Sequence, residues 1–120
     1  MAIKYIHDRG VCHRDLKPDN IFLTRNNIIK IGDLGVSKIL EDTDHFTKSA
    51  AGTPPYMSFE CIKGEPYSKE TDMWSLGVIL YNLMTFELPF FAENVKGISK
   101  LIKKGYYKPV KEIVGDDLYS

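Results

Sequence analysis

The sequence predicts a mainly α-helical fold that contains one small β-hairpin. Residues 68–86 are apolar around nearly the whole circumference of a helix, which is typical of a helix inside a core. The segments NIFLT (20–24) and NIIKI (27–31) are short, β-branched and apolar, and a polar turn separates them. Together with a hydrophobic content of 43% over 120 residues, these observations indicate a folded chain of one domain or less.

The first elements can be read in chain order. Residues 2–8 have the spacing of a short amphipathic helix, with Ile3 and Ile6 on one face and Gly10 beyond its end. Helix nucleation is costly, so we expect this helix to be the end of a longer one. Residues 32–56 carry Gly, Ser, Thr, Asp and Pro without a period, which predicts a long loop of the kind that is usually functional.

The remaining segments are helical. Ser68 can cap the long helix, and Glu70 and Asp72 suit the positive end of its dipole. The segment ELPF ends this helix. Residues 92–104 predict a second, amphipathic helix with a basic polar face, and the tail begins a further one. The apolar residues that cover most of the circumference of the long helix are Met73, Trp74, Leu76, Val78, Ile79, Leu80, Leu83 and Met84.

Composition excludes several classes of protein. The 16 basic residues balance 16 acidic ones, which argues against a general nucleic-acid or membrane surface. No apolar run is long enough to cross a bilayer, and the first residues do not resemble a signal peptide. Cys12 and Cys61 are isolated, so we expect a reduced, intracellular and cytoplasmic chain with both thiols packed.

The polar segment VCHRDLKPDN, residues 11–20, lies between apolar runs and could be either a solvated loop or a catalytic one. Asn20 and Asp33 offer hard oxygen ligands that suit Mg²⁺, and the predicted hairpin would bring them together. Asp15 would then be a carboxylate beside the metal, able to accept a hydroxyl proton. Lys17 could neutralise a phosphoryl oxygen. These are the parts that phosphoryl transfer requires.

Four motifs resemble those of eukaryotic protein kinases. HRDLKPDN, DLG, GTPPYMSFE and DMWSLGVILY are similar to the catalytic loop, the metal-binding motif, the end of the activation segment and the central helix of that family. They occur in the family's order and at its spacing. The resemblance covers residues 1–120 and implies a partial protein kinase domain, the C-terminal lobe without the N-terminal lobe and the last helices. It further implies that the isolated chain is not competent for catalysis.

The subclass follows from details of these motifs. Lys17 and Thr53 resemble the serine/threonine type, and NIFLT, DLG and GTPPYMS are similar to NIMA-related kinases. The resemblance implies transfer of the γ-phosphoryl group of Mg-ATP to Ser or Thr of protein substrates, with ATP and Mg²⁺ as cofactors. The alternative is a truncated, non-catalytic lobe that acts as a binding module. A small-molecule phosphotransferase is a third possibility, against which the peptide-substrate segment GTPPYMSFE argues.

The resemblance also assigns roles to single residues. Asp15 is implied as the catalytic base with Lys17 beside it, and the metal ligands are Asn20 and Asp33. Phe22 would lie under the adenine ring, although its ordinary role would be that of a core aromatic. The residues implied for the ATP site are Lys17, Asn20, Phe22 and Asp33. Asp15, Asn20 and Asp33 could otherwise be ordinary loop and turn residues.

Further residues are implied as structural or regulatory ones: His13, Arg14, Ser49, Thr53, Glu60 and Asp72. Asp72 would accept backbone N–H groups of His13 and Arg14, although a role as helix-dipole partner is the simpler alternative. Arg14 would bind a phosphate on the loop, with Ser49 favoured over Thr43 and Thr47.

One position departs from the family pattern. Phe59 replaces the proline that usually precedes Glu60. The arginine that usually pairs with this glutamate is absent from the chain, so Glu60 is expected to be a buried, unpaired carboxylate.

Overall fold

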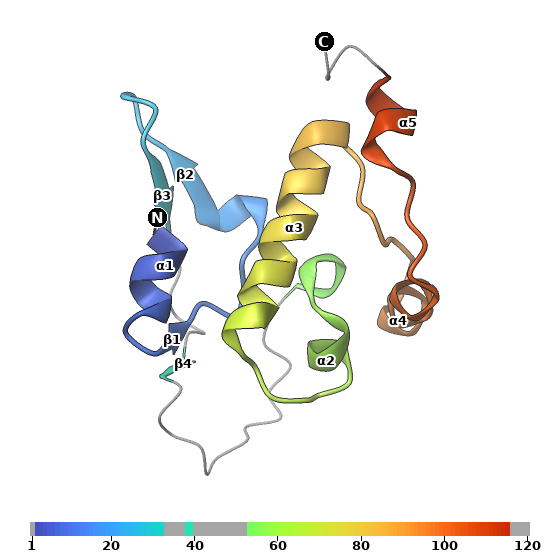
Figure 1. Ribbon diagram of the computed structural model, residues 1–120, viewed down its shortest axis with the longest axis horizontal. Coiled ribbons are helices and arrows are strands. Elements are labelled where there is room, and N and C mark those ends of the chain that lie inside the picture. The colour runs from blue at the N-terminus through green and yellow to red at the C-terminus, as the bar shows by residue number, and fades with distance from the viewer. Residues whose placement is uncertain (1, 33–37, 40–52, 116–120) are drawn as a thin grey trace.

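The computed structural model describes residues 2–32, 38–39 and 53–115. The long helix α3 (Lys69–Thr85) lies at its centre, between a β-hairpin with α1 (Ala2–His7) on one side and α4 (Val95–Lys104) with α5 (Val110–Val114) on the other (Figure 1). A short helix, α2 (Phe59–Ile62), precedes α3. The fold prediction of a mainly helical chain with a small hairpin is confirmed for the described residues.

The predicted hairpin is formed by β2 (Ile21–Leu23) and β3 (Ile29–Ile31), which pair antiparallel with Phe22 opposite Lys30. Its turn places Asn27 at φ 59°, a left-handed conformation that asparagine tolerates better than most residues. Where the hairpin closes, the Gly32 backbone N–H donates to the Asn20 carbonyl at 2.9 Å. The last residue of the polar loop and the residue that precedes Asp33 are therefore fixed side by side.

The prediction of one continuous loop over residues 32–56 is wrong at two places. A second two-stranded sheet forms where β4 (Lys38–Ile39) pairs antiparallel with β1 (Val11–Cys12). Residues Pro54–Tyr56 form a 3₁₀ turn, η3, and Pro18–Asn20 form another, η1. A strand of two residues is too short to show an alternating pattern in the sequence. Its pairing is decided by the tertiary partner and not by local propensity.

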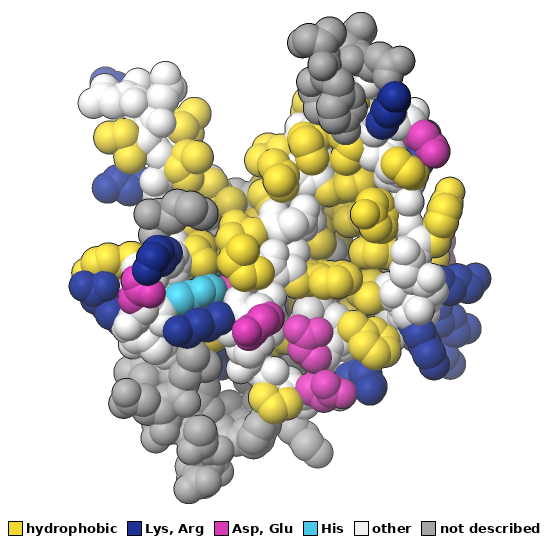
Figure 2. Space-filling model, in the orientation of Figure 1, with side chains coloured by type: hydrophobic (Ala, Val, Ile, Leu, Met, Phe, Trp, Pro, Cys, Tyr) yellow, Lys and Arg dark blue, Asp and Glu magenta, His cyan; other side chains and the backbone are white. Residues whose placement is uncertain are grey.

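The helix α3 begins after Ser68, as predicted, and the Ser68 backbone N–H donates to Thr71 Oγ1 at 3.1 Å. It ends at Thr85, where Phe86 adopts the left-handed conformation with φ 57°. The core covers one side of this helix in the described part of the chain. One side is buried through Val78 and Ile79, whereas three apolar side chains of the other side are 54–64% exposed: Met73, Leu80 and Leu83. Figure 2 shows hydrophobic side chains gathered over the middle of the molecule, where α3 lies.

The buried cluster beside α3 anchors the polar loop. It consists of Ile3 from α1, Leu16 from the loop and Ile79 from α3, and both strands of the hairpin contribute partly buried isoleucines to it. Leu16 is only 1% exposed, and burial of a leucine side chain contributes roughly 1.5–3 kcal/mol. The loop is therefore attached to the core at its middle, between the charged residues on either side.

The two cysteines are free and buried, which confirms the prediction that both thiols are packed. Burial raises the pKa of the Cys12 thiol to about 11, and it raises the pKa of Cys61 as well. Both side chains are therefore protonated at neutral pH and behave as small apolar groups.

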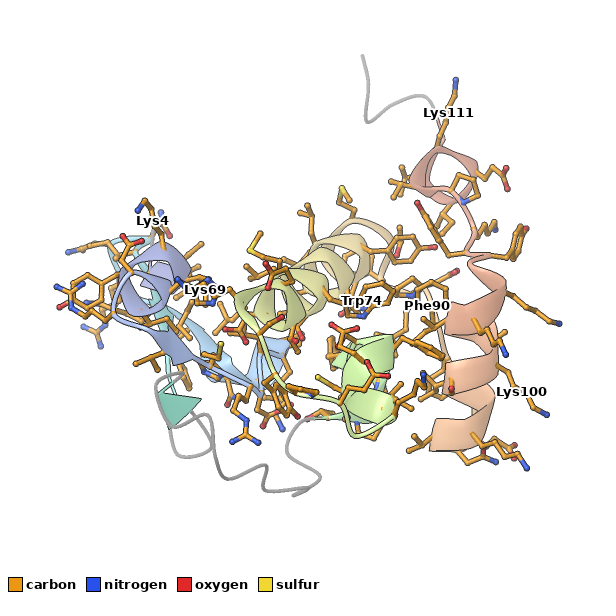
Figure 3. The ribbon with its side chains drawn as sticks, turned by 60° about the horizontal axis from the view of Figure 1, so that its bottom comes forward. Lys4, Lys69, Trp74, Phe90, Lys100 and Lys111 are labelled. Carbon is orange, nitrogen blue, oxygen red and sulfur yellow. The ribbon has the colours of Figure 1, made fainter. Side chains whose placement is uncertain are left out.

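The second predicted helix, α4, starts three residues later than expected because Asn94 caps it, with Oδ1 accepting the Gly97 N–H at 2.8 Å. Aromatic rings connect this part of the chain to α3. Trp74 stacks on Phe90 with ring centroids 5.9 Å apart (Figure 3), and Tyr107 meets Phe90 edge-on at 6.0 Å. The tail helix expected from the sequence is α5. Among the described residues, no helix has the length and apolar character needed to cross a membrane.

Candidate active site

Asp72, in the first turn of α3, fixes the beginning of the polar loop. Its side chain is almost fully buried, and Oδ2 accepts the His13 backbone N–H at 2.9 Å while Oδ1 accepts that of Arg14 at 3.1 Å. His7 on α1 donates from Nε2 to Oδ2 at 2.7 Å. These are the backbone contacts that the resemblance implied. A helix-dipole role alone does not account for them, because it requires no partner on another segment.

His7 is a residue of this site that the sequence reasoning missed. It lies four residues after Ile3 and therefore on the buried face of α1, where a histidine needs a hydrogen-bond partner. That position was a detectable signal for burial. Its partner, 65 residues away, was not detectable from local sequence.

His13 connects the loop to the end of the hairpin. Its Nδ1 accepts the Asp15 backbone N–H at 3.2 Å, and its Nε2 lies 2.8 Å from the Gly32 carbonyl oxygen. Since a carbonyl only accepts and a backbone N–H only donates, the proton belongs on Nε2. Between these contacts Arg14 adopts φ 76°, a conformation that costs an L-residue roughly 1–3 kcal/mol. The hydrogen bonds to Asp72 and His13 hold this turn in place.

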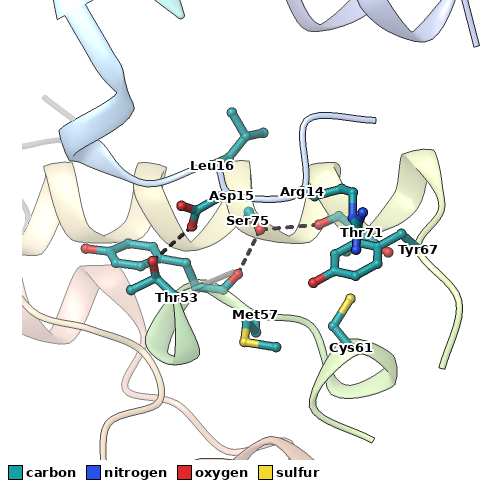
Figure 4. A pocket seen from close by; sticks show the side chains of 10 residues that line it. Arg14, Asp15, Leu16, Thr53, Met57, Cys61, Tyr67, Thr71 and Ser75 are labelled. Atoms are coloured by element: carbon teal, nitrogen blue, oxygen red, sulfur yellow. Dashed lines mark hydrogen bonds between the residues drawn. The ribbon is translucent and has the colours of Figure 1, made fainter. Parts of the chain in front are cut away.

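The Asp15 carboxylate faces a hydroxyl group and an ammonium group. Thr53 donates from Oγ1 to Asp15 Oδ1 at 2.9 Å (Figure 4), and Lys17 Nζ lies 3.6 Å from Oδ2. The structure thus brings together three of the residues selected from the sequence. A carboxylate that accepts a hydrogen bond from an alcohol has the arrangement required of a general base toward a hydroxyl nucleophile.

Asn20 is buried next to this carboxylate. Its Nδ2 donates to the Asp15 backbone carbonyl at 2.7 Å, which leaves the amide oxygen as the atom that can bind a cation. Phe22 lies on β2 and covers Gly32, where an added Cβ would come within 2.6 Å of the Phe22 ring. Asp33 lies outside the described residues.

Arg14 extends toward α2 on the other side of the turn. Its guanidinium group lies 4.3 Å from the Tyr67 ring centroid, close to Cys61 (Figure 4). Burial raises the pKa of Tyr67 to about 12. The Nε atom of Arg14 is buried and has no hydrogen-bond partner among the described residues. A small cavity of about 10 Å³ is lined by Arg14, Asp15 and Thr53 together with these side chains.

The expectation of a buried, unpaired Glu60 is wrong. Glu60 is only partly buried, and Thr71 Oγ1 donates to its Oε1 at 3.4 Å. Glu60 is therefore neither fully buried nor without a hydrogen-bond partner. Ser49 lies outside the described residues.

Replacing Phe59 by proline is expected to leave stability unchanged or to raise it slightly. Phe59 is the first residue of α2, directly after the cap Ser58, where a backbone N–H has no partner within the helix and proline is well tolerated. Proline also restricts the unfolded chain, which contributes about 0.4–1 kcal/mol at compatible positions. Thermal unfolding of Phe59→Pro beside the parent chain measures this. A drop of many degrees would instead mean that the phenylalanine ring fills a necessary place beside Lys63, which lies 5.2 Å from its centroid.

Comparisons with known proteins identify the family of the chain. The family described as the protein kinase domain matches residues 1–117. Serine/threonine-protein kinase Nek1 of Mus musculus is 38% identical over 120 residues, which cover all of this chain and 10% of that protein. Nek5 of Mus musculus is 40% identical over 121 residues, covering all of this chain and 19% of the relative. The G2-specific protein kinase fin1 of Schizosaccharomyces pombe is 40% identical over 111 residues, covering 92% of this chain and 15% of the relative.

The chain thus spans between a tenth and a fifth of the length of these relatives. The aligned span includes the loop, the hairpin and the central helix. The chain belongs to the protein kinase domain family, and its relatives include serine/threonine kinases of the Nek type.

Proposed function

We propose that the protein containing this chain is a serine/threonine protein kinase and that these residues form part of its C-terminal lobe. One observation carries the proposal: the Asp15 carboxylate accepts a hydrogen bond from an aliphatic hydroxyl, Thr53 Oγ1, at 2.9 Å. A Ser or Thr side chain of a protein substrate would present the same group to the same atom. The names of the Nek relatives support the same substrate class.

In this proposal Asp15 would accept the proton of the attacking hydroxyl as its oxygen forms a bond to the γ-phosphorus of ATP, while the bond from that phosphorus to the bridging oxygen breaks and ADP leaves. Mg-ATP, when bound, supplies the γ-phosphoryl group and the charge of the metal ion. Lys17, whose Nζ lies 3.6 Å from the carboxylate, stabilises the negative charge of the transferring group. The hydrogen bonds from Asp72 to the loop backbone keep both side chains in one orientation.

The cation would be held by Asn20 and Asp33. The free amide oxygen of Asn20 suits a hard cation, and the hydrogen bond between Gly32 and the Asn20 carbonyl supports a position of Asp33 near it. Phe22 is 54% exposed on β2 and offers an apolar surface on which an adenine ring could pack.

Arg14 would bind a phosphate carried by Ser49. The support is the unpartnered Nε of Arg14 among the described residues, since a guanidinium group binds phosphate well through paired N–H donors. Such a contact would order the loop by adding charge-assisted hydrogen bonds to a turn that is already held in an unusual conformation.

The proposal is tested by incubating the whole protein with labelled ATP, Mg²⁺ and peptides that contain only Ser, only Thr or only Tyr as acceptor. We expect label on Ser or Thr peptides, and none after the metal is removed with EDTA. Asp33→Ala should weaken Mg²⁺-dependent nucleotide binding by about ten-fold or more, because a charged ligand of the cation is lost.

Asp19→Ala is the matched control, since Asp19 is an exposed carboxylate of the same loop and should leave nucleotide binding unchanged. Label on tyrosine alone would contradict the substrate class. Nucleotide binding without transfer to any peptide would favour the alternative of a non-catalytic binding module.

A further inference from the structure

The helix α4 presents four lysines on one face: Lys96, Lys100, Lys103 and Lys104. At about 100° per residue, these positions fall within an arc of about 100° around the helix axis. All four side chains are exposed, and none forms an ion pair with another described residue. Basic side chains gather at the edge of the molecule where α4 lies, and Lys100 points away from the rest of the chain (Figures 2 and 3).

The stability of the helix does not explain this arrangement. Lys103 and Lys104 suit the negative end of the helix dipole, but Lys96 is the second residue of the helix and lies at the positive end. Lys96 and Lys100 repel each other at a spacing of four residues, as do Lys100 and Lys104. The helix contains no acidic residue that would offset these pairs.

The lysines lie on a helix whose two ends and buried face are fixed by the neighbouring residues. Asn94 caps the beginning of α4, and Gly105 ends it with φ 67°. Ile98, on the opposite face, is only 2% exposed, and Gly97 lies so close to Ala92 that an added Cβ would come within 2.6 Å. The backbone positions of the lysines are therefore fixed before a ligand binds, which lowers the entropic cost of binding.

We propose that this lysine face of α4 binds a short acidic segment, rich in Glu and Asp, of a protein partner. The helix is about 15 Å long, which matches four to five residues of an extended peptide. The lysine face is limited to the ten residues of α4, and Glu93, two residues before the helix, carries the opposite charge. Such limits favour a short segment over a continuous anionic surface such as a membrane or a nucleic acid.

Apolar groups next to the lysine face complete the surface. Phe91 is 64% exposed just before α4, and Tyr106 is 72% exposed just after it. Exposed aromatic residues beside charged ones are typical of protein interfaces, where they supply contact area and the charges supply selectivity. The chain as a whole has no net charge, so the attraction would come from this local face and not from the overall charge.

The test measures binding and does not depend on phosphoryl transfer. A fluorescein-labelled 12-residue peptide of alternating Glu and Tyr is titrated against the chain by fluorescence anisotropy, at low and at high salt. We expect binding that weakens as salt rises. The double variant Lys96→Glu, Lys100→Glu should lower the affinity by about ten-fold or more, because two attractions become repulsions.

Lys30→Glu with Lys69→Glu is the matched control, because it changes the net charge equally at exposed positions on β3 and at the start of α3. It should change affinity by less than about two-fold. Circular dichroism checks that both variants remain folded. Equal losses in the two double variants would overturn the proposal. Tighter binding of phosphatidylserine vesicles or duplex DNA than of the peptide, lost in the α4 variant alone, would overturn it as well and assign the face to that ligand.

Discussion

Asp15→Asn is expected to lower phosphoryl transfer by the whole protein by a factor of about 10²–10⁴ while nucleotide binding stays unchanged. The amide has nearly the shape of the carboxylate, so it can still accept the hydrogen bond from Thr53 Oγ1. It cannot accept a proton from the attacking hydroxyl, because an amide is not a base near neutral pH. Initial rates of peptide phosphorylation and nucleotide affinity, measured on the same preparation, separate the two effects.

Asp19→Asn makes the same chemical change at an exposed position of the same loop and should leave the rate unchanged. Because both variants replace aspartate by asparagine, a difference between their rates is due to the position of the residue. Wild-type turnover by Asp15→Asn would contradict the role of base. If Asp15→Asn lowered both the rate of phosphorylation and the affinity for nucleotide, Asp15 would act on the metal site and not on the hydroxyl.

Local signals explain why much of the fold could be predicted. The hairpin was predicted because its two strands are apolar and close in sequence, and α3 because a cap precedes a long apolar period. The pairing of β4 with β1 was missed, since it depends on contact between residues 26 and 28 positions apart in the sequence. The short helix α2 was missed although its cap Ser58, which accepts the Cys61 N–H at 3.4 Å, was a usable signal.

For the same reason, the part of the candidate site that is close in sequence could be predicted, whereas its long-range contacts could not. Asp15, Lys17 and Asn20 lie within six residues, so their spacing alone indicated shared chemistry. The structure adds the hydrogen bond from Thr53, which is 38 residues from Asp15, and the histidine at position 7. Such long-range contacts arise from packing around α3 and leave no trace in local sequence patterns.

Asp72→Ala is expected to destabilise the chain more than any other single substitution in the site. It leaves the buried backbone N–H of His13 and the partly buried one of Arg14 without their acceptor, and it removes the partner of His7. Each buried donor left unsatisfied costs about 1–3 kcal/mol, so the expected loss in the free energy of unfolding is roughly 2–5 kcal/mol. Single domains are stable by only about 5–15 kcal/mol, so this is a large fraction.

Denaturant unfolding of Asp72→Ala beside Glu70→Ala distinguishes two roles of Asp72. Both carboxylates lie in the first turn of α3, but Glu70 is exposed, and hydrogen bonds with its own backbone N–H and Ser68 lower its pKa. If Asp72 acted only on the helix dipole, the two variants would lose similar, small amounts of stability. If Asp72 holds the loop, only its variant loses several kcal/mol. Asp72→Asn should fall between them, because an amide offers one acceptor and places a donor against the second N–H group.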